Sequence, residues 1–330
     1  MTRQAIHPKK AERPKVGAVC LSLLLFFTFA LLLRRADIAT TCMKDGLTLC
    51  ARAIVPSLFP FMVLSELLVA TGTGEYLTAP LARPLKKLLG LSSAGCTALV
   101  LGLLCGFPVG ARCAISSYEK GRMEKKECER VLACSSIPSS AFLISTVGGS
   151  LWQNLNFGIF LYACTVFSAI LSGFLLYVVQ KRRKSERKLP LSASNIFPHF
   201  KAEMLSSAVK NATTSTLLIC AYVVLFSTLG GAFEIVLERF SASETMHAII
   251  ASILELSGGV STASMLSNRK LAKILTGATV GWSGISVHCQ MLSLCDGHNI
   301  SLCPYLIAKL AQAVFCAVAM CAALSLDIFY

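Results

Sequence analysis

The sequence predicts an all-α polytopic membrane protein, an inverted-topology repeat with two re-entrant or broken helical hairpins. Three observations predict this class. Apolar residues make up 55% of the 330 positions, whereas a soluble domain has about 45–50%. Long apolar runs alternate with short basic segments, as in membrane proteins. The order of uninterrupted and Gly/Pro-interrupted runs in the first half also recurs in the second.

The formal charge of +14 is spread over short runs between apolar stretches. No basic face studded with aromatic residues appears, so we expect the lipid bilayer as a partner and no nucleic acid. Most of the 15 Cys lie inside apolar runs, where a thiol behaves as a small hydrophobe. The close pairs Cys42/Cys50 and Cys289/Cys295 lack metal-ligand spacing, so no metal or cofactor is expected.

Residues 1–35 are predicted to form a cytoplasmic tail and an anchor helix. Five basic residues precede the apolar run 16–33, which is about long enough to span a bilayer. Arg34 and Arg35 follow this run in place of a small-residue cleavage site. We therefore expect the anchor to be retained and the N-terminus to lie in the cytoplasm.

Repeat 1 is predicted over 36–180. Apolar residues at helical spacing indicate an interfacial helix over 36–55, which Pro56 is expected to break. A span at 57–72 follows, and then a basic loop that contains Pro80 and Pro84. Its charge predicts a cytoplasmic location.

The segment 94–118 is apolar but interrupted at 106–112 by Gly, Pro and Arg. Its exit loop, 119–130, is strongly basic, and so is the loop before the segment. Both ends should therefore lie on the cytoplasmic side, which predicts a re-entrant hairpin. Spans at 131–149 and 157–179 complete the repeat, and a basic cytoplasmic linker at 181–211 is expected to hold a surface helix over 200–210.

Repeat 2 is predicted over 212–330 and follows the same order. A span at 215–236 is followed by a hairpin at 248–266 interrupted at 257–262, and then by spans at 274–294 and 304–326. Repeat 1 begins with an outside-to-inside span and repeat 2 with the opposite, the arrangement of many secondary transporters. In this topology the basic loop 267–273 falls outside, against the usual charge rule.

Each interrupted hairpin should expose unpaired N–H groups and the positive end of a helix dipole near the bilayer midplane. Such tips suit an anion, and Gly lets the backbone approach it closely. Arg112 can hold a carboxylate bidentately, or it can snorkel to the interface as an anchor. The predicted substrate-binding residues are Gly106, Pro108, Gly110, Arg112, Ser139, Ser140, Gly258, Gly259, Ser261, Thr262, Ser283, Ser286, His288 and Gln290.

Two acidic residues, Glu66 and Glu255, lie inside apolar runs. Either can couple transport to a proton or cation, or can be a neutral, hydrogen-bonded packing residue. His288 can likewise contact substrate or shuttle protons, or serve a structural purpose.

Four segments together resemble a known family: 56–61 (PSLFPF), 106–111 (GFPVGA), 127–132 (ECERVL) and 284–290 (GISVHCQ). They are similar to the sporulation integral membrane protein YlbJ family, which contains the nucleoside-recognition gate domain, over roughly 40–325. The resemblance implies a multi-pass protein of the cell membrane or outer forespore membrane that moves dipicolinate during endospore formation. The chain departs from the family in having Phe107, where Tyr is often seen, and in its Cys content.

The gate domain is also similar to parts of concentrative nucleoside transporters, so a nucleoside-like substrate stays open. A third reading is a membrane scaffold that organises a sporulation complex without moving solute. An enzyme is not expected, because no HExxH motif, nucleophile elbow or paired membrane Asp is present. Homo-oligomerisation is left open. The expected partner is a small anionic solute.

Overall fold

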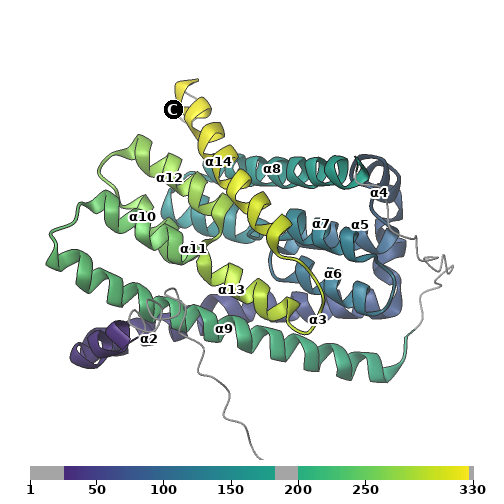
Figure 1. Cartoon of the computed structure of the whole chain (residues 1–330), viewed down its shortest axis with the longest axis horizontal. Helices are drawn as coiled ribbons and strands as arrows, with labels where there is room; N and C mark the ends of the chain where they lie inside the picture. Colours follow the sequence, from purple (N-terminus) through teal and green to yellow (C-terminus); the bar gives the residue numbers. More distant parts are fainter. Residues whose placement is uncertain (1–25, 183–199, 327–330) are drawn as a thin grey trace, which may run out of the picture.

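The computed structural model describes residues 26–182 and 200–326, and every regular element in these ranges is a helix (Figure 1). Three of the described helices are long and apolar enough to cross a membrane: α8 (Leu155–Arg182), α9 (Ala202–Arg239) and α14 (Cys303–Ser325). These helices confirm the predicted all-α polytopic class. Most of the predicted anchor 16–33 and of the linker 181–211 lies outside the described residues.

The first layer pairs α9 with a helical rod made of α2 (Ala36–Leu49), the π-helical turn η1 (Cys50–Ile54) and α3 (Val55–Thr71). The two run antiparallel along the lower side of the molecule in Figure 1. Glycines bring them together: a Cβ on Gly46 would lie 3.1 Å from Val224 Cα, and one on Gly231 would lie 2.4 Å from Cys42 Sγ. This close approach is typical of membrane helix pairs.

Pro56 does not break this rod, contrary to the prediction. The chain stays helical because the preceding turn is π-helical, with Val55 N–H donating to Cys50 O in the wider i→i−5 pattern. A π turn accommodates the proline ring and its missing N–H without ending the helix. The predicted interfacial helix and first span are therefore one element.

The predicted loop after α3 is also wrong, because residues Thr73–Leu89 form the helix α4. Pro80 and Pro84 lie inside it, and both are exposed. The carbonyls that lose a backbone donor, those of Tyr76 and Pro80, therefore also belong to exposed residues, where water or headgroups can bind them. α4 stands upright at the right-hand end of Figure 1.

The structure contains a helical hairpin in each half of the chain, as the sequence predicts. The first consists of α5 (Ser93–Cys105) and α6 (Val109–Glu119), with its tip at 106–108. The second consists of α10 (Glu244–Leu254) and α11 (Leu256–Ser264). Its break is at Glu255 and not at the predicted 257–262, because the Glu255 side chain caps α11 and lets the helix start at once.

Two predicted spans are each divided in two. The segment 131–149 is split between α7 (Lys125–Ser135) and the π-helical segment η2 (Phe142–Leu151). The segment 274–294 is split between α12 (Arg269–Trp282) and α13 (Gly284–Cys295), which meet at Ser283 in the left-handed conformation. The predicted surface helix 200–210 is the first part of α9, not a separate element.

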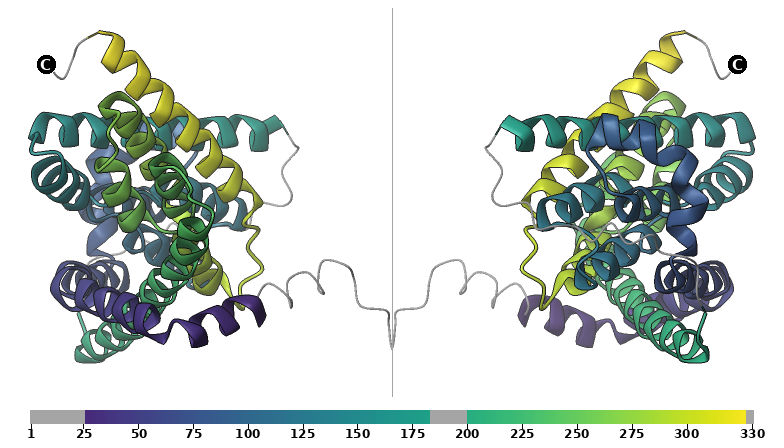
Figure 2. Two further views of the ribbon diagram at one scale, coloured as in Figure 1. Left: turned by 90° about the vertical axis from the view of Figure 1, so that its left-hand side faces the viewer. Right: turned by 90° about the vertical axis from the view of Figure 1, so that its right-hand side faces the viewer.

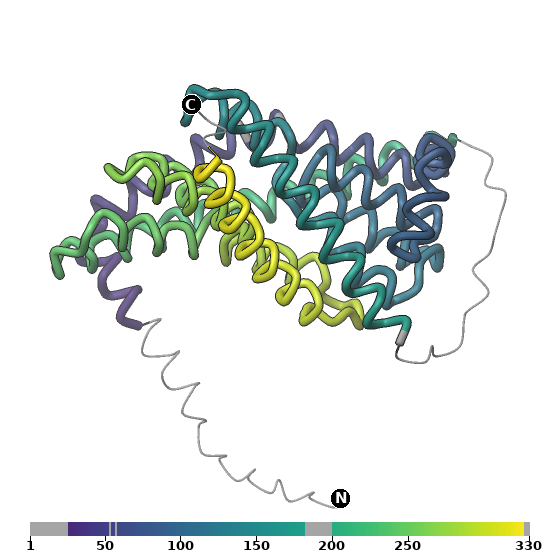
Figure 3. The backbone as a smooth tube through the Cα atoms, turned by 90° about the horizontal axis from the view of Figure 1, so that it is seen from above, coloured from purple at the N-terminus to yellow at the C-terminus, as the bar shows by residue number. Residues whose placement is uncertain are grey.

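Hairpins and divided spans fill the middle of the molecule, between the α3–α9 layer below and α8 with α14 above (Figures 1 and 2). Helices α8 and α14 lie side by side (Figure 3), with α8 along the upper side and α14 slanting down from the top in Figure 1. Apart from α4, which has no counterpart among the described residues of the second half, each half runs in the same order: a long rod, a hairpin, a divided span and a long helix. The opposite orientation of the halves across a membrane stays a prediction.

One end of the molecule gathers the basic segments predicted to be cytoplasmic. Arg130 links them: its guanidinium donates to Gly90 O (2.9 Å) and to Gln180 Oε1 near the end of α8. Glu127 accepts from Ser92 N–H at 2.6 Å. Burial raises the pKa of the Glu127 carboxyl, and the hydrogen bonds from Ser92 oppose that shift. These contacts tie α4, α7 and α8 into one end.

The basic loop 267–273 lies at a different place. Arg269 stacks over the Trp152 ring, with its guanidinium carbon 4.4 Å from the centroid, and donates to Ser264 O at 2.6 Å. The Ser267 hydroxyl binds the Glu244 carboxylate at 3.0 Å. This loop therefore groups with the turn before α8 and the start of α10, both of which we predict to lie outside.

Candidate substrate site

The tip of the first hairpin packs directly on the break between α7 and η2. Phe107, which precedes a cis proline, donates its N–H to Ile137 O at 2.6 Å. Gly106 has φ +80°, and a Cβ there would lie 2.4 Å from Ser139 N. No other residue type fits this conformation and this approach together. The two interruptions in the first half therefore form one joint.

Both predicted serines of this joint bind backbone. Ser140 Oγ donates to Leu104 O at 3.0 Å, in the last turn of α5. Ser139 Oγ accepts at 3.2 Å from the N–H of Phe142, the first residue of η2. Pro108 is the N-cap residue of α6. These residues hold the joint in its observed shape.

The second half contains a matching joint between the α10–α11 tip and the α12–α13 break. Gly284 has φ +83°, and a Cβ there would lie 2.9 Å from Glu255 Cα. Trp282 Nε1 donates to Ile253 O at 3.1 Å, as Ser140 does to Leu104 in the first half. Each half thus has a hairpin tip locked to the break of the next span.

The predicted residues of α11 do not form an open tip with free N–H groups. Gly259 is a packing residue, because a Cβ there would lie 2.4 Å from Ser252 Cα. Gly258 is exposed, and its N–H donates to Glu255 Oε2 at 2.7 Å. Thr262 Oγ1 donates to Gly258 O, and Ser261 O accepts from Ser264 Oγ. The start of α11 is therefore already capped by a carboxylate of the chain.

Arg112 lies one turn inside α6 and is paired. Its Nε is 2.9 Å from Oε1 of Glu66 on α3, and both side chains are largely buried. Sequence reasoning named the two residues separately, and the structure brings them together. Gly110, predicted to approach a ligand, instead lies against α5: a Cβ there would be 2.5 Å from Gly102 Cα.

The remaining predicted residues are Ser283 at the α12–α13 break and Ser286, His288 and Gln290 on α13, and all four are buried. His288 Nδ1 and the Tyr305 hydroxyl of α14 are 2.8 Å apart, and the Trp282 ring meets the imidazole edge-on. His288 Nε2 has no hydrogen-bond partner among the described residues. Ser286 Oγ accepts from Gln290 Nε2 at 3.2 Å, and Ser283 Oγ donates to Val280 O. His288 is thus the residue here with unused hydrogen-bonding capacity.

Sequence reasoning missed Lys309 and Gln312, which are fully buried on α14. Lys309 Nζ donates to Ser136 O at 3.0 Å, and Gln312 Nε2 donates to Ala133 O at 3.0 Å. The amine of Lys309 and the amide of Gln312, both from the second half, therefore cap the carbonyl end of α7 at the first joint. The signal was present, because Lys309 is a charge inside a predicted span.

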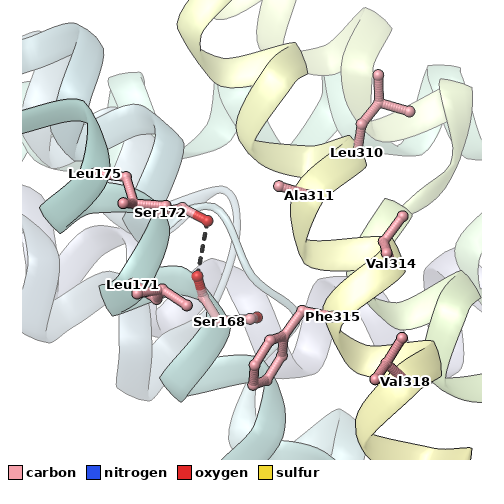
Figure 4. A pocket seen from close by; sticks show the side chains of 9 residues that line it. All are labelled: Ser168, Leu171, Ser172, Leu175, Leu310, Ala311, Val314, Phe315 and Val318. Atoms are coloured by element: carbon pink, nitrogen blue, oxygen red, sulfur yellow. Dashed lines mark hydrogen bonds between the residues drawn. The ribbon is translucent and has the colours of Figure 1, made fainter. Parts of the chain in front are cut away.

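A separate apolar groove of about 540 Å³ lies between α8 and α14, lined by leucine and valine side chains with Phe315, Ser168 and Ser172 (Figure 4). The Ser172 hydroxyl donates to Ser168 O, so it does not present a free donor. None of the predicted site residues lines the groove. The described residues contain no group of three or more His, Cys, Asp or Glu placed to hold a metal ion.

Apolar long helices around two joints of interrupted helices define a multi-pass α-helical membrane protein with a buried polar interior. The chain is similar to the sporulation integral membrane protein YlbJ of Bacillus subtilis (strain 168), with 23% identity over 339 residues, 92% of this chain and 82% of that protein. This match confirms the predicted resemblance to the YlbJ family. No family model and no solved structure matches the chain.

Proposed function

We propose that the chain is a membrane carrier for a small anionic solute, and that dipicolinate moved during endospore formation is its substrate. The observation that carries the proposal is the repeated joint, in which a hairpin tip locks onto a broken span in each half. Interrupted helices at membrane depth require neighbouring groups to bind their free backbone, and carriers use such places to bind substrate.

The anionic class is supported by what the chain itself places near the joints. Arg112 is held by the Glu66 carboxylate, and the start of α11 is held by the Glu255 carboxylate. Both positively polarised groups that we assign to the substrate thus bind a carboxylate in the observed state. A substrate carboxylate that displaces Glu66 or Glu255 would find the same donors. Protonation of either Glu would make the exchange easier, which is a route to proton coupling.

The similarity to a protein named for sporulation supports the setting. Dipicolinate is a planar dicarboxylate and suits two positively polarised groups better than a neutral nucleoside does. A scaffold that moves no solute has no need for joints that depend on Gly106 and Gly284.

The test is flux of labelled dipicolinate into liposomes that contain the purified full chain, with uridine measured in parallel. We expect dipicolinate flux, and a loss of at least tenfold in Gly106→Ala and Gly284→Ala, whose new Cβ atoms would push the tips off the breaks. Gly297→Ala is the matched control: it has φ +74° but nothing within 4 Å of an added Cβ. Absence of flux for dipicolinate in well-folded wild-type protein would refute the proposal, and uridine flux alone would assign a nucleoside carrier.

A further inference from the structure

Helix α4 presents three different faces along its length. One face is buried against the bundle through Gly74, Thr78 and Leu89. A second face, at helical spacing, is apolar and open to the surroundings. A third is basic and exposed. The open apolar side chains are Leu77, Leu81 and Leu88, and the basic ones are Arg83, Lys86 and Lys87; the exposed Tyr76, seven residues before Arg83, lies on the basic face.

The direction of α4 is fixed by the hairpin that follows it. Its axis makes an angle of 99° with α5, and Figure 1 shows it lying across the end of the long helices. Thr78 Oγ1 and Thr97 Oγ1 are 2.8 Å apart, and Gly90 O accepts from Arg130. A helix held at right angles to a membrane hairpin, at the end of the bundle, lies in the plane of the membrane surface.

We propose that α4 is an interfacial helix that binds anionic phospholipid headgroups. Its open leucines enter the acyl boundary, and the cations on the basic face bind headgroup phosphates. The charge of this helix is not neutralised from within: its one acidic residue, Glu75, faces Arg122 at 3.7 Å. Because α4 leads directly into α5, headgroup binding would also fix the position of the first hairpin.

The basic face is tested by counting lipids retained by the purified full chain in mixed micelles of phosphatidylglycerol and phosphatidylcholine. We expect wild type to prefer phosphatidylglycerol, and the triple variant Arg83→Gln, Lys86→Gln, Lys87→Gln to lose at least tenfold of that preference, since each cation contributes about fivefold. The control carries the same three charge losses at exposed positions on other helices, Lys44→Gln, Lys210→Gln and Lys270→Gln.

Retention of the preference in the α4 triple variant, or an equal loss in the control, would overturn the proposal. The apolar face is tested with Leu77→Trp and bilayers brominated at shallow acyl positions. Relative to wild type, the added fluorescence should be quenched by the bromolipid and not by aqueous iodide. Quenching by iodide alone would place the helix in water. Neither measurement depends on transport, so both stand whether or not the chain is a carrier.

Discussion

The Arg112–Glu66 pair sets what either residue can do. The sequence identifies each as a charge at membrane depth, a rule that needs no structure. It does not show that they meet, because 46 positions separate them and the contact depends on how α6 packs on α3. Pairing makes Glu66 a built-in competitor for any carboxylate that Arg112 would bind.

Glu66→Gln should therefore lower the KM for dipicolinate flux. The amide keeps the shape and one acceptor but removes the negative charge, so a charge-assisted bond worth about 1.5–3 kcal/mol no longer competes with substrate. We expect a KM about tenfold lower, together with a lower thermal midpoint because the buried guanidinium loses its counter-ion. Glu75→Gln, beside the less buried Arg122, should leave KM unchanged. An unchanged or higher KM in Glu66→Gln would show that Glu66 does not compete.

Lys309, like Arg112, is a charged residue type inside a predicted membrane segment, but it is absent from the predicted site. Nothing in the local sequence shows that its side chain would reach the carbonyl of Ser136, 173 positions away. Gly258 and Gly259 lie within the predicted interruption 257–262, where glycine would let the backbone approach a ligand closely. Glu255, placed three residues before Gly258, caps α11 instead and moves the break.

At the scale of elements, the sequence predicts where membrane helices exist better than where they bend. Apolar runs placed α8, α9 and α14 within a few residues, apart from the polar start of α9. The interruptions at 136–139 and at Ser283 are not predicted by hydropathy, because short stretches with Ser barely lower it; Pro138 and Gly284 are the local signals that mark these breaks. Pro56, Pro80 and Pro84 were read as breakers, but a π turn and open carbonyls keep those helices intact.

The carbonyl end of α7 is an element boundary held by α14, and Lys309→Met tests that role. The substitution keeps a chain of similar volume but leaves Ser136 O without its donor inside a buried region. We expect a loss of about 1–3 kcal/mol of stability, measured as a lower thermal midpoint in detergent. Lys270→Met, exposed on α12, should have no effect. If Lys309→Met were as stable as wild type, the cap would not be needed.

The whole molecule has two distinct polar ends, and this arrangement depends on tertiary contacts. The C-terminal end of α4 and the segment 119–130 meet near the end of α8 through Arg130, whereas the segment 267–273 lies with Trp152 and Glu244. The prediction that placed 267–273 outside went against its charge. Arg269 is stacked on an aromatic ring and bound to a carbonyl, so its charge is partly satisfied within the protein and is a weaker topology signal; the outside location stays a prediction.

The predicted topology therefore requires Gly121 and Ser267 to face opposite sides of the membrane. Single cysteines at these positions, Gly121→Cys and Ser267→Cys, should be introduced into a chain whose native Cys are replaced. Both positions are exposed, and an added side chain at Gly121 meets nothing within 4 Å, so its cost is the local strain of a non-glycine residue at φ +67°. A membrane-impermeant maleimide applied to intact cells should label Ser267→Cys and spare Gly121→Cys, and lysis should make both reactive. Labelling of both from outside, or of Gly121→Cys alone, would contradict the inverted repeat, because the first hairpin would then not return to the cytoplasmic side.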